Sequence, residues 1–182
     1  DWNDKNMKYA MCFFPMVGAA IGLIVWAVYT ISCQLQIGDI LRTALLIVLP
    51  VLITGGIHLD GFIDTMDAIN SYQPVERKLE ILKDSHIGAF ALICCIVYFV
   101  INFGIWSEAG GKDLTILCIG FILSRAFSAL SIVTFPCAKK SGLAASFSDA
   151  AQKNAVRITM YVYICICAAA MLYIDIILDL VF

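Results

Sequence analysis

Charged residues are scarce in this sequence. Only 14% of its 182 residues are Asp, Glu, Lys or Arg, whereas 62% are hydrophobic and the mean hydropathy is +0.91. In a soluble domain about a quarter of the residues are charged, so this composition excludes an ordinary soluble protein. No stripe of basic residues runs along any segment, which argues against nucleic acid as a partner. The composition predicts a polytopic integral membrane protein.

The sequence also lacks the cysteine spacing of a metal or disulfide framework. It has 8 cysteines but no Cys-x-x-Cys pair, and they lie in, at the ends of or just beyond apolar runs. We interpret them as small residues that face lipid or the protein core.

An initiator Met and a signal-peptide layout are absent too, and the last residues lie inside an apolar run. We therefore expect residues 1–182 to form one integral membrane domain of a longer chain.

Long apolar runs are abundant. A helix needs roughly 20 apolar residues to cross the hydrocarbon core, and five segments meet that length. They are residues 9–33, 40–58, 88–106, 114–136 and 156–182. Small residues in the first segment, such as Gly18 and Gly22, predict close helix packing. The predicted fold class is all-α, a transmembrane bundle of about five spans with an Asp-rich loop or helix.

The distribution of Lys and Arg predicts the orientation. With five spans, nine of the 12 basic residues fall on the N-terminal side, two fall on the other side, and Arg125 lies within a span. Cytoplasmic loops carry the excess of positive charge. We therefore expect the N-terminal side to face the cytoplasm, in the plasma (inner) membrane of a prokaryote.

One stretch of the chain carries a concentration of carboxylates. Asp60, Asp64 and Asp67 follow the second apolar run at spacings of four and three, so in a helix they share one face. Repulsion between them indicates a cation, and Mg²⁺ is the first candidate because it prefers oxygen ligands shared with substrate phosphates. A simpler interpretation is that Asp60 is the N-cap of a helix whose dipole favours Asp64. We favour a metal-dependent phosphoryl-transfer site at the membrane surface.

The polar segment after these acids has its own pattern. Residues 69–74 indicate a turn, and residues 75–84 have apolar side chains at helical spacing, which predicts a short amphipathic helix at the membrane surface or a solvated connector. Asp84, Ser85 and His86 then lead into the third span.

Basic residues elsewhere are candidates to bind phosphate. Lys139 and its neighbour Lys140 lie beside glycine and serine in the loop of residues 137–154, which could bind phosphates, contact lipid head groups or set orientation. Arg125 follows Ser124 in the fourth span, where an unpaired charge costs several kcal/mol. We expect Arg125 to face a carboxylate or a water-filled cavity.

These residues together resemble a known family, the cobalamin synthases (adenosylcobinamide-GDP ribazoletransferases). The resemblance covers most of the chain and is most specific in the string His58-Leu59-Asp60-Gly61 with Asp64-Thr65 and Asp67-Ala68, and in Lys83-Asp84-Ser85. Further matches are Phe14-Pro15-Met16-Val17-Gly18, Arg77-Lys78-Leu79-Glu80-Ile81, Ile87-Gly88, Ser124-Arg125 and Gly142-Leu143. His86 departs from the family, where arginine is expected. Members of the family extend beyond both ends of this chain.

The resemblance implies a transferase. It would join adenosylcobinamide-GDP to α-ribazole or its 5'-phosphate, giving adenosylcobalamin or its phosphate and GMP in the last steps of cobalamin biosynthesis. Asp60, Asp64 and Asp67 would hold Mg²⁺, and His58 or Asp84 would accept the hydroxyl proton. The expected substrate-binding residues are Lys78, Lys83, Ser85, Ser124, Arg125 and Lys139.

Two other functions are alternatives. A Mg²⁺-dependent alcohol phosphotransferase of the CDP-alcohol type uses similar Asp-rich helices, but its complete Asp-Gly-x-x-Ala-Arg spacing is missing here. A cation transporter could use the acids as an ion path, although a transporter should place them near the bilayer midplane. Expected partners are the two substrates and membrane lipids, and the sequence leaves a homo-oligomer open.

Overall fold

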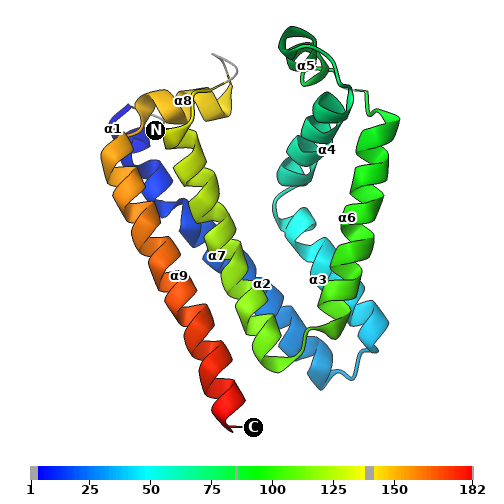
Figure 1. Ribbon diagram of the computed structural model, residues 1–182. Helices are drawn as coiled ribbons and strands as arrows, with labels where there is room; N and C mark the ends of the chain where they lie inside the picture. Colours follow the sequence, from blue (N-terminus) through cyan, green and yellow to red (C-terminus); the bar gives the residue numbers. More distant parts are fainter. Residues whose placement is uncertain (1–3, 85, 138–141, 182) are drawn as a thin grey trace. The chain divides into compact units, whose positions relative to one another are not determined.

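A computed structural model describes residues 4–84, 86–137 and 142–181, and helices make up almost all of this part of the chain (Figure 1). No strand occurs among these residues. The helices are α1 (Asp4–Ala10), the 3-10 turn η1 (Met11–Phe13), α2 (Phe14–Gln34), α3 (Asp39–Ile53), α4 (Ile57–Asn70), α5 (Val75–Ile81), α6 (Ala89–Glu108), α7 (Gly111–Thr134), α8 (Leu143–Ala150) and α9 (Lys153–Val181). The predicted all-α class is confirmed.

The predicted spans are confirmed with one exception. By length and composition, four helices in the described part of the chain can cross a membrane: Met7–Gln34, Ala89–Glu108, Asp113–Thr134 and Lys153–Ile176. A fifth span is possible only if α3 and α4 are counted as one span, and these two helices meet at a bend of 90°. The second predicted span, residues 40–58, is therefore wrong as a continuous helix, because α3 ends at Ile53.

The chain falls into two compact units. The first consists of Asp1–Ala27 and Gly110–Phe182, and contains the start of α2 together with α7, α8 and α9. Helices α7 and α9 lie side by side in it, with a core of Met11, Ala126, Ala129, Val133, Val156 and Met160. Small residues in this core let the two helices approach closely.

Glycines bring α2 against α7 in the same unit. A Cβ added to Gly18 would overlap the backbone carbonyl of Phe121, and one added to Gly22 would lie 2.6 Å from the carbonyl oxygen of Cys118. Backbone atoms cannot move aside as a flexible side chain can. The close packing predicted from the small residues of the first span is therefore confirmed.

The second unit, Val28–Ala109, contains the end of α2 and helices α3 to α6. Helices α3 and α4 both pack along α6, and α5 contacts α4. The rings of Phe62 on α4 and Tyr98 on α6 lie 5.5 Å apart between centroids. Most large apolar side chains of α6 are exposed, and Ala91 is its fully buried residue. Such a helix is suited to lie with its outer face in lipid.

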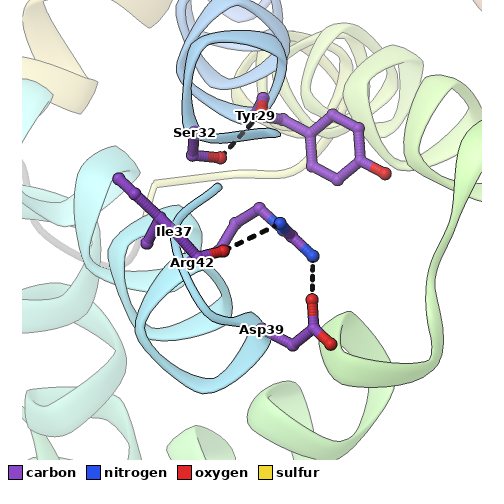
Figure 2. A network of polar contacts seen from close by, with 5 residues as sticks. All are labelled: Tyr29, Ser32, Ile37, Asp39 and Arg42. Carbon is purple, nitrogen blue, oxygen red and sulfur yellow. Dashed lines mark hydrogen bonds and ion pairs between the residues drawn. The ribbon is translucent and has the colours of Figure 1, made fainter. Parts of the chain in front are cut away.

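Polar contacts hold the turn between α2 and α3 (Figure 2). The Arg42 guanidinium donates to the carbonyl oxygen of Ile37 at 3.1 Å, forms an ion pair with Asp39, and lies 5.5 Å from the centroid of the Tyr29 ring. The Ser32 hydroxyl donates to the carbonyl oxygen of Tyr29 at 2.7 Å. Arg42 thus satisfies a carbonyl at the turn and brings the polar start of α3 beside the end of α2.

Three predictions for the connecting segments are resolved. The amphipathic helix predicted for residues 75–84 exists as α5, but it ends at Ile81. The segment of residues 137–154, predicted as a loop, contains helix α8. That prediction was wrong because serine and alanine show little hydropathy, although Ala145 and Ser148 are buried. The turn predicted at residues 69–74 is confirmed for residues 71–74, whereas residues 69 and 70 still belong to α4.

Candidate active site

The acidic segment is a helix that begins at a sharp break in the chain. Helix α3 ends where the Thr54 hydroxyl donates to the carbonyl oxygen of Pro50 at 2.8 Å. Gly55 and Gly56 follow with φ of 61° and 77°, a left-handed conformation that favours glycine because it has no Cβ. Helix α4 then starts at Ile57 in a direction bent by 90°. The two glycines therefore set the direction of the helix that carries the carboxylates.

Helix α4 presents the three carboxylates on one side. At about 100° per residue, Asp60, Asp64 and Asp67 lie within roughly 60° of one another around the axis. Asp60 is exposed, whereas Asp64 and Asp67 are half-buried. Asp60 also lies in the first turn of the helix, where the macrodipole stabilises negative charge. Its carboxylate makes no hydrogen bond or ion pair with another residue that the structure describes.

Asp67 connects α4 to the start of α6. Its Oδ2 accepts a hydrogen bond from the backbone N–H of Gly88 at 2.6 Å. Gly88 is the N-cap of α6, and a Cβ at this position would overlap the Asp67 carboxylate. The N–H groups at a helix start have no partner within the helix, so Asp67 satisfies one of them with a charged acceptor. This carboxylate has a structural partner in addition to any role in metal binding.

The carboxylate oxygens of α4 are suitable ligands for Mg²⁺, but the side chains of the described residues are not arranged as a complete metal site. Within residues 4–84, 86–137 and 142–181, no group of three or more His, Cys, Asp or Glu side chains is arranged to hold a metal ion. Mg²⁺ is usually bound by one or two carboxylates together with waters and substrate phosphates. Two neighbouring carboxylates on α4 are ligands of the type and number that Mg²⁺ usually takes from a protein. The predicted metal role of Asp60, Asp64 and Asp67 stays a prediction.

His58 and Asp84 differ in their surroundings. His58 lies in the first turn of α4, about 200° around the axis from Asp60, so it starts from the side opposite the acids. Asp84 lies between α5 and α6, where its Oδ1 is 2.6 Å from His86 Nδ1 and accepts the His86 backbone N–H at 3.0 Å. These hydrogen bonds from His86 lower the pKa of Asp84. Asp84 is therefore a carboxylate at neutral pH and a weak proton acceptor.

The remaining predicted residues of this unit lie around α5. Lys78 is half-buried on α5, and Lys83 is exposed just beyond it. Neither forms an ion pair with a carboxylate in the described part of the chain, so both ammonium groups can bind an anion. Because α5 packs against α4, Lys78 lies on the helix next to the acids. Ser85 lies outside the described residues.

The other predicted residues belong to the first unit. Arg125 lies on α7 with its guanidinium 5.7 Å from the centroid of the Phe14 ring. Its Nε is buried without a hydrogen-bond partner in the part of the chain that the structure describes. The expected carboxylate partner is not found there, and the aromatic face takes its place through a cation–π contact. Ser124 is exposed, and Lys139 lies outside the described residues.

Sequence reasoning missed two residues of this region, and the first is Gly88. It contacts Asp67 from 21 positions away, and no helical or strand periodicity links residues so far apart. A weak signal existed, since Gly88 stands immediately before an apolar run where a helix start was expected. The Asn70 side chain was also missed, and its Nδ2 lies 3.8 Å from Cys94 Sγ on α6.

Comparison with known proteins identifies the family. A sequence model described as cobalamin-5-phosphate synthase matches residues 1–182. This chain belongs to the cobalamin-5-phosphate synthase family. A family relative from Lachnoclostridium phytofermentans, named adenosylcobinamide-GDP ribazoletransferase, is 49% identical over 181 residues, which are 100% of this chain and 69% of the relative.

Other relatives of the family carry the same name. One from Clostridium botulinum (strain Eklund 17B / Type B) is 37% identical over 150 residues, covering 81% of this chain and 60% of the relative. One from Geobacillus sp. (strain WCH70) is 33% identical over 171 residues, covering 92% and 65%. The chain thus spans between 60% and 69% of the length of these three relatives. No solved structure matches it.

Proposed function

We propose that this protein acts as an adenosylcobinamide-GDP ribazoletransferase in cobalamin biosynthesis. The observation that carries the proposal is the family match over residues 1–182, together with the relative that is 49% identical and carries this name. The helical architecture agrees with the polytopic membrane protein that the composition predicted. A soluble fold would have argued against the proposal.

The proposed reaction is a displacement at phosphorus. A hydroxyl oxygen of the ribazole ribose attacks the cobinamide-linked phosphorus of adenosylcobinamide-GDP. The attacking hydroxyl is not the 5' one, because the 5' oxygen carries the phosphate in the 5'-phosphate form and keeps it in the product. A new P–O bond forms, the bond to the bridging oxygen breaks, and GMP leaves with that oxygen. The hydroxyl proton passes to a base. Such a reaction depends on positioning and charge neutralisation rather than on a protein nucleophile.

We assign the metal role to α4. Asp60 and Asp64 would hold Mg²⁺ as neighbours on one helix face, and Asp67 would add a third carboxylate while anchoring α6 through Gly88. The ion, when bound, would neutralise charge on the diphosphate and on the departing phosphate. The support is the chemistry of the donors, because hard carboxylate oxygens are the ligands that Mg²⁺ prefers.

The proton acceptor is proposed to be His58 rather than Asp84. A general base works best when its pKa is near the operating pH. The hydrogen bonds from His86 lower the pKa of Asp84 and weaken it as a base, whereas an imidazole ordinarily titrates near neutral pH. His58 lies on the side of α4 opposite the three carboxylates. For His58 to accept the proton, the attacking hydroxyl must therefore reach around the helix. Asp84 would then act through its charge.

The phosphate groups of the substrates are proposed to bind cationic and hydroxyl side chains. Lys78 and Lys83 are the candidates beside α4, the helix that carries the three carboxylates and is called the acid helix below. Neither lysine is paired with a described carboxylate. Ser85, Ser124, Arg125 and Lys139 stay predictions of the family resemblance. The excess of Lys and Arg on one side of the spans supports a cytoplasmic orientation of the acid helix.

The test is release of GMP by the purified protein. Incubation with adenosylcobinamide-GDP, α-ribazole and Mg²⁺ should yield GMP and a corrinoid product in equal amounts. Asp64→Asn should lower turnover at least a hundredfold and still be inserted in the membrane. Asp113→Asn, a matched change at an exposed position in the first turn of α7, should keep turnover. GMP release by Asp64→Asn at the wild-type rate would contradict the metal role.

The same assay separates the alternatives. A phosphotransferase of the CDP-alcohol type would release CMP from a CDP-alcohol and no GMP from the corrinoid substrate. A cation transporter would release neither nucleotide. Neither alternative is favoured by the family match.

A further inference from the structure

A pocket of the first unit has no role in the proposed transfer chemistry. It has a volume of ≈ 700 Å³ and lies where α7 ends, α8 passes and α9 begins. Residues of all three helices line it, among them Thr134, Ser148 and Arg157. Because α7 and α9 are both long enough to span a membrane, the pocket lies at the polar ends of two spans. It shares no residue with α4.

Arg157 is held in this pocket with unused donor capacity. Its Nη2 donates to the carbonyl oxygen of Val133, the residue before Thr134 on α7, at 2.9 Å. Its Nε is buried and makes no hydrogen bond within the described part of the chain. A buried N–H without an acceptor costs about 1–3 kcal/mol. The guanidinium is therefore fixed in place and carries a donor that a ligand oxygen would satisfy.

Ser148 is a second polar residue that lines the pocket. Only 6% of the residue is exposed, and its hydroxyl makes no hydrogen bond to another residue that the structure describes. The neighbouring Ser146, which has the same residue type on the same helix, donates to the carbonyl oxygen of Gly142 at 3.2 Å. Ser148 and Arg157 both line the pocket, so the hydroxyl and the guanidinium can each donate to an oxygen of a ligand bound there.

The charges around the pocket select an anion. Lys153 and Arg157 supply two positive charges, and Asp149 supplies one negative charge at the exposed side of α8. A guanidinium, an ammonium and hydroxyl groups together form the donor set that binds phosphate oxygens. Phe135 and Pro136 form an apolar part of the wall and can contact an organic group attached to the phosphate.

We propose that this pocket binds the phosphate group of a phosphomonoester through Arg157, Lys153 and Ser148. At the polar ends of two spans, such a group can come from a soluble metabolite or from a lipid head group. The proposal rests on the residues of the pocket and not on the transferase assignment, and α-ribazole 5'-phosphate is one phosphomonoester of the class it names. A negative result for phosphate binding in this pocket would not bear on the chemistry of α4. A negative result in the GMP-release assay would not bear on this pocket.

The experiment uses Cys137, a free and exposed thiol that lines the pocket. The purified protein in detergent is treated with N-ethylmaleimide, and alkylation of Cys137 is followed by peptide mass spectrometry. Cys33, another exposed free thiol, is the internal control. One arm adds inorganic phosphate or glycerol 3-phosphate at constant ionic strength, and the other adds phosphatidic acid in place of phosphatidylcholine.

We expect at least threefold slower alkylation of Cys137 with no change at Cys33. Protection by the soluble phosphates assigns a soluble ligand, and protection by phosphatidic acid alone assigns a lipid head group. Ser148→Ala should raise the half-protecting concentration about tenfold, and Arg157→Gln should raise it further. Lys8→Gln removes a positive charge of the same unit outside the pocket lining and should have no effect. Absence of protection in both arms, or equal protection of wild type and Ser148→Ala, would overturn the proposal.

Discussion

Replacing Gly88 by alanine should break the hydrogen bond that connects the start of α6 to Asp67 on α4. The added Cβ would overlap the Asp67 carboxylate, which must rotate away and release the Gly88 N–H. A hydrogen bond to a charged acceptor contributes about 1.5–3 kcal/mol. The φ and ψ of Gly88, -80° and 162°, are accessible to alanine, so the lower entropy of the unfolded chain returns about 0.4–1 kcal/mol. We expect a net loss of about 1–2 kcal/mol in the free energy of unfolding.

The measurement is thermal unfolding of the purified protein in detergent, followed by tryptophan fluorescence. For a chain of this size the loss corresponds to a decrease in Tm of about 2–8 °C. Gly104→Ala is the matched control on the same helix, because nothing lies within 4 Å of a Cβ at that position. It should leave the Tm unchanged or raise it, since alanine favours a helix interior.

A double-mutant cycle tests the cause. In an Asp67→Ala background the carboxylate that the new Cβ would overlap is gone, so Gly88→Ala should then cost nothing or stabilise slightly. If Gly88→Ala lowers the Tm equally in both backgrounds, the destabilisation does not act through Asp67. If Gly88→Ala unfolds at the wild-type temperature, the hydrogen bond between α4 and α6 contributes no stability. Either result would refute the reasoning.

Three further predictions follow from single contacts. Gly56→Ala should lower the free energy of unfolding by about 1–2 kcal/mol because its φ of 77° is left-handed, and Gly56→Asn should cost less in the same thermal assay. Gly18→Ala should cost about 1–3 kcal/mol because the Phe121 backbone cannot move aside, and unchanged Tm would contradict that close packing. Hydrogen bonds from His86 lower the pKa of Asp84 in the folded protein, so their stabilisation is complete above about pH 4 and is lost as pH falls through that lowered pKa. His86→Ala should raise the pKa of Asp84 in an NMR titration, and an unchanged titration would exclude this contact.

Much of the fold followed from hydropathy and glycine positions. Four apolar runs became helices within a few residues of their predicted ends, because a membrane requires long segments with internally satisfied backbone groups. The second run was predicted to continue to His58, whereas α3 ends at Ile53. Glycine is nearly neutral on a hydropathy scale, so the turn at Gly55 and Gly56 was invisible to a sliding window although the Gly-Gly pair is a recognised turn signal.

The candidate site was predicted in its residue types but not in its contacts. Spacing alone placed Asp60, Asp64 and Asp67 on one helix face, since the period of a helix is a local property. The partner of Asp67 lies 21 positions away on α6, and it is brought there by packing between α4 and α6. Burial of Ser148 beside Arg157 likewise depends on three helices that meet around one pocket.

The sequence by itself determined that this chain is helical, that it belongs in a membrane and that three carboxylates share a helix face. These properties depend on composition and on short-range periodicity, which act within a single helix. Only the tertiary structure decided that the acid helix turns away from α3, that Asp67 caps α6 and that an arginine and a serine face one pocket. Those features arise from contacts between helices, where sterics and unsatisfied hydrogen-bonding groups of residues distant in the sequence must be matched.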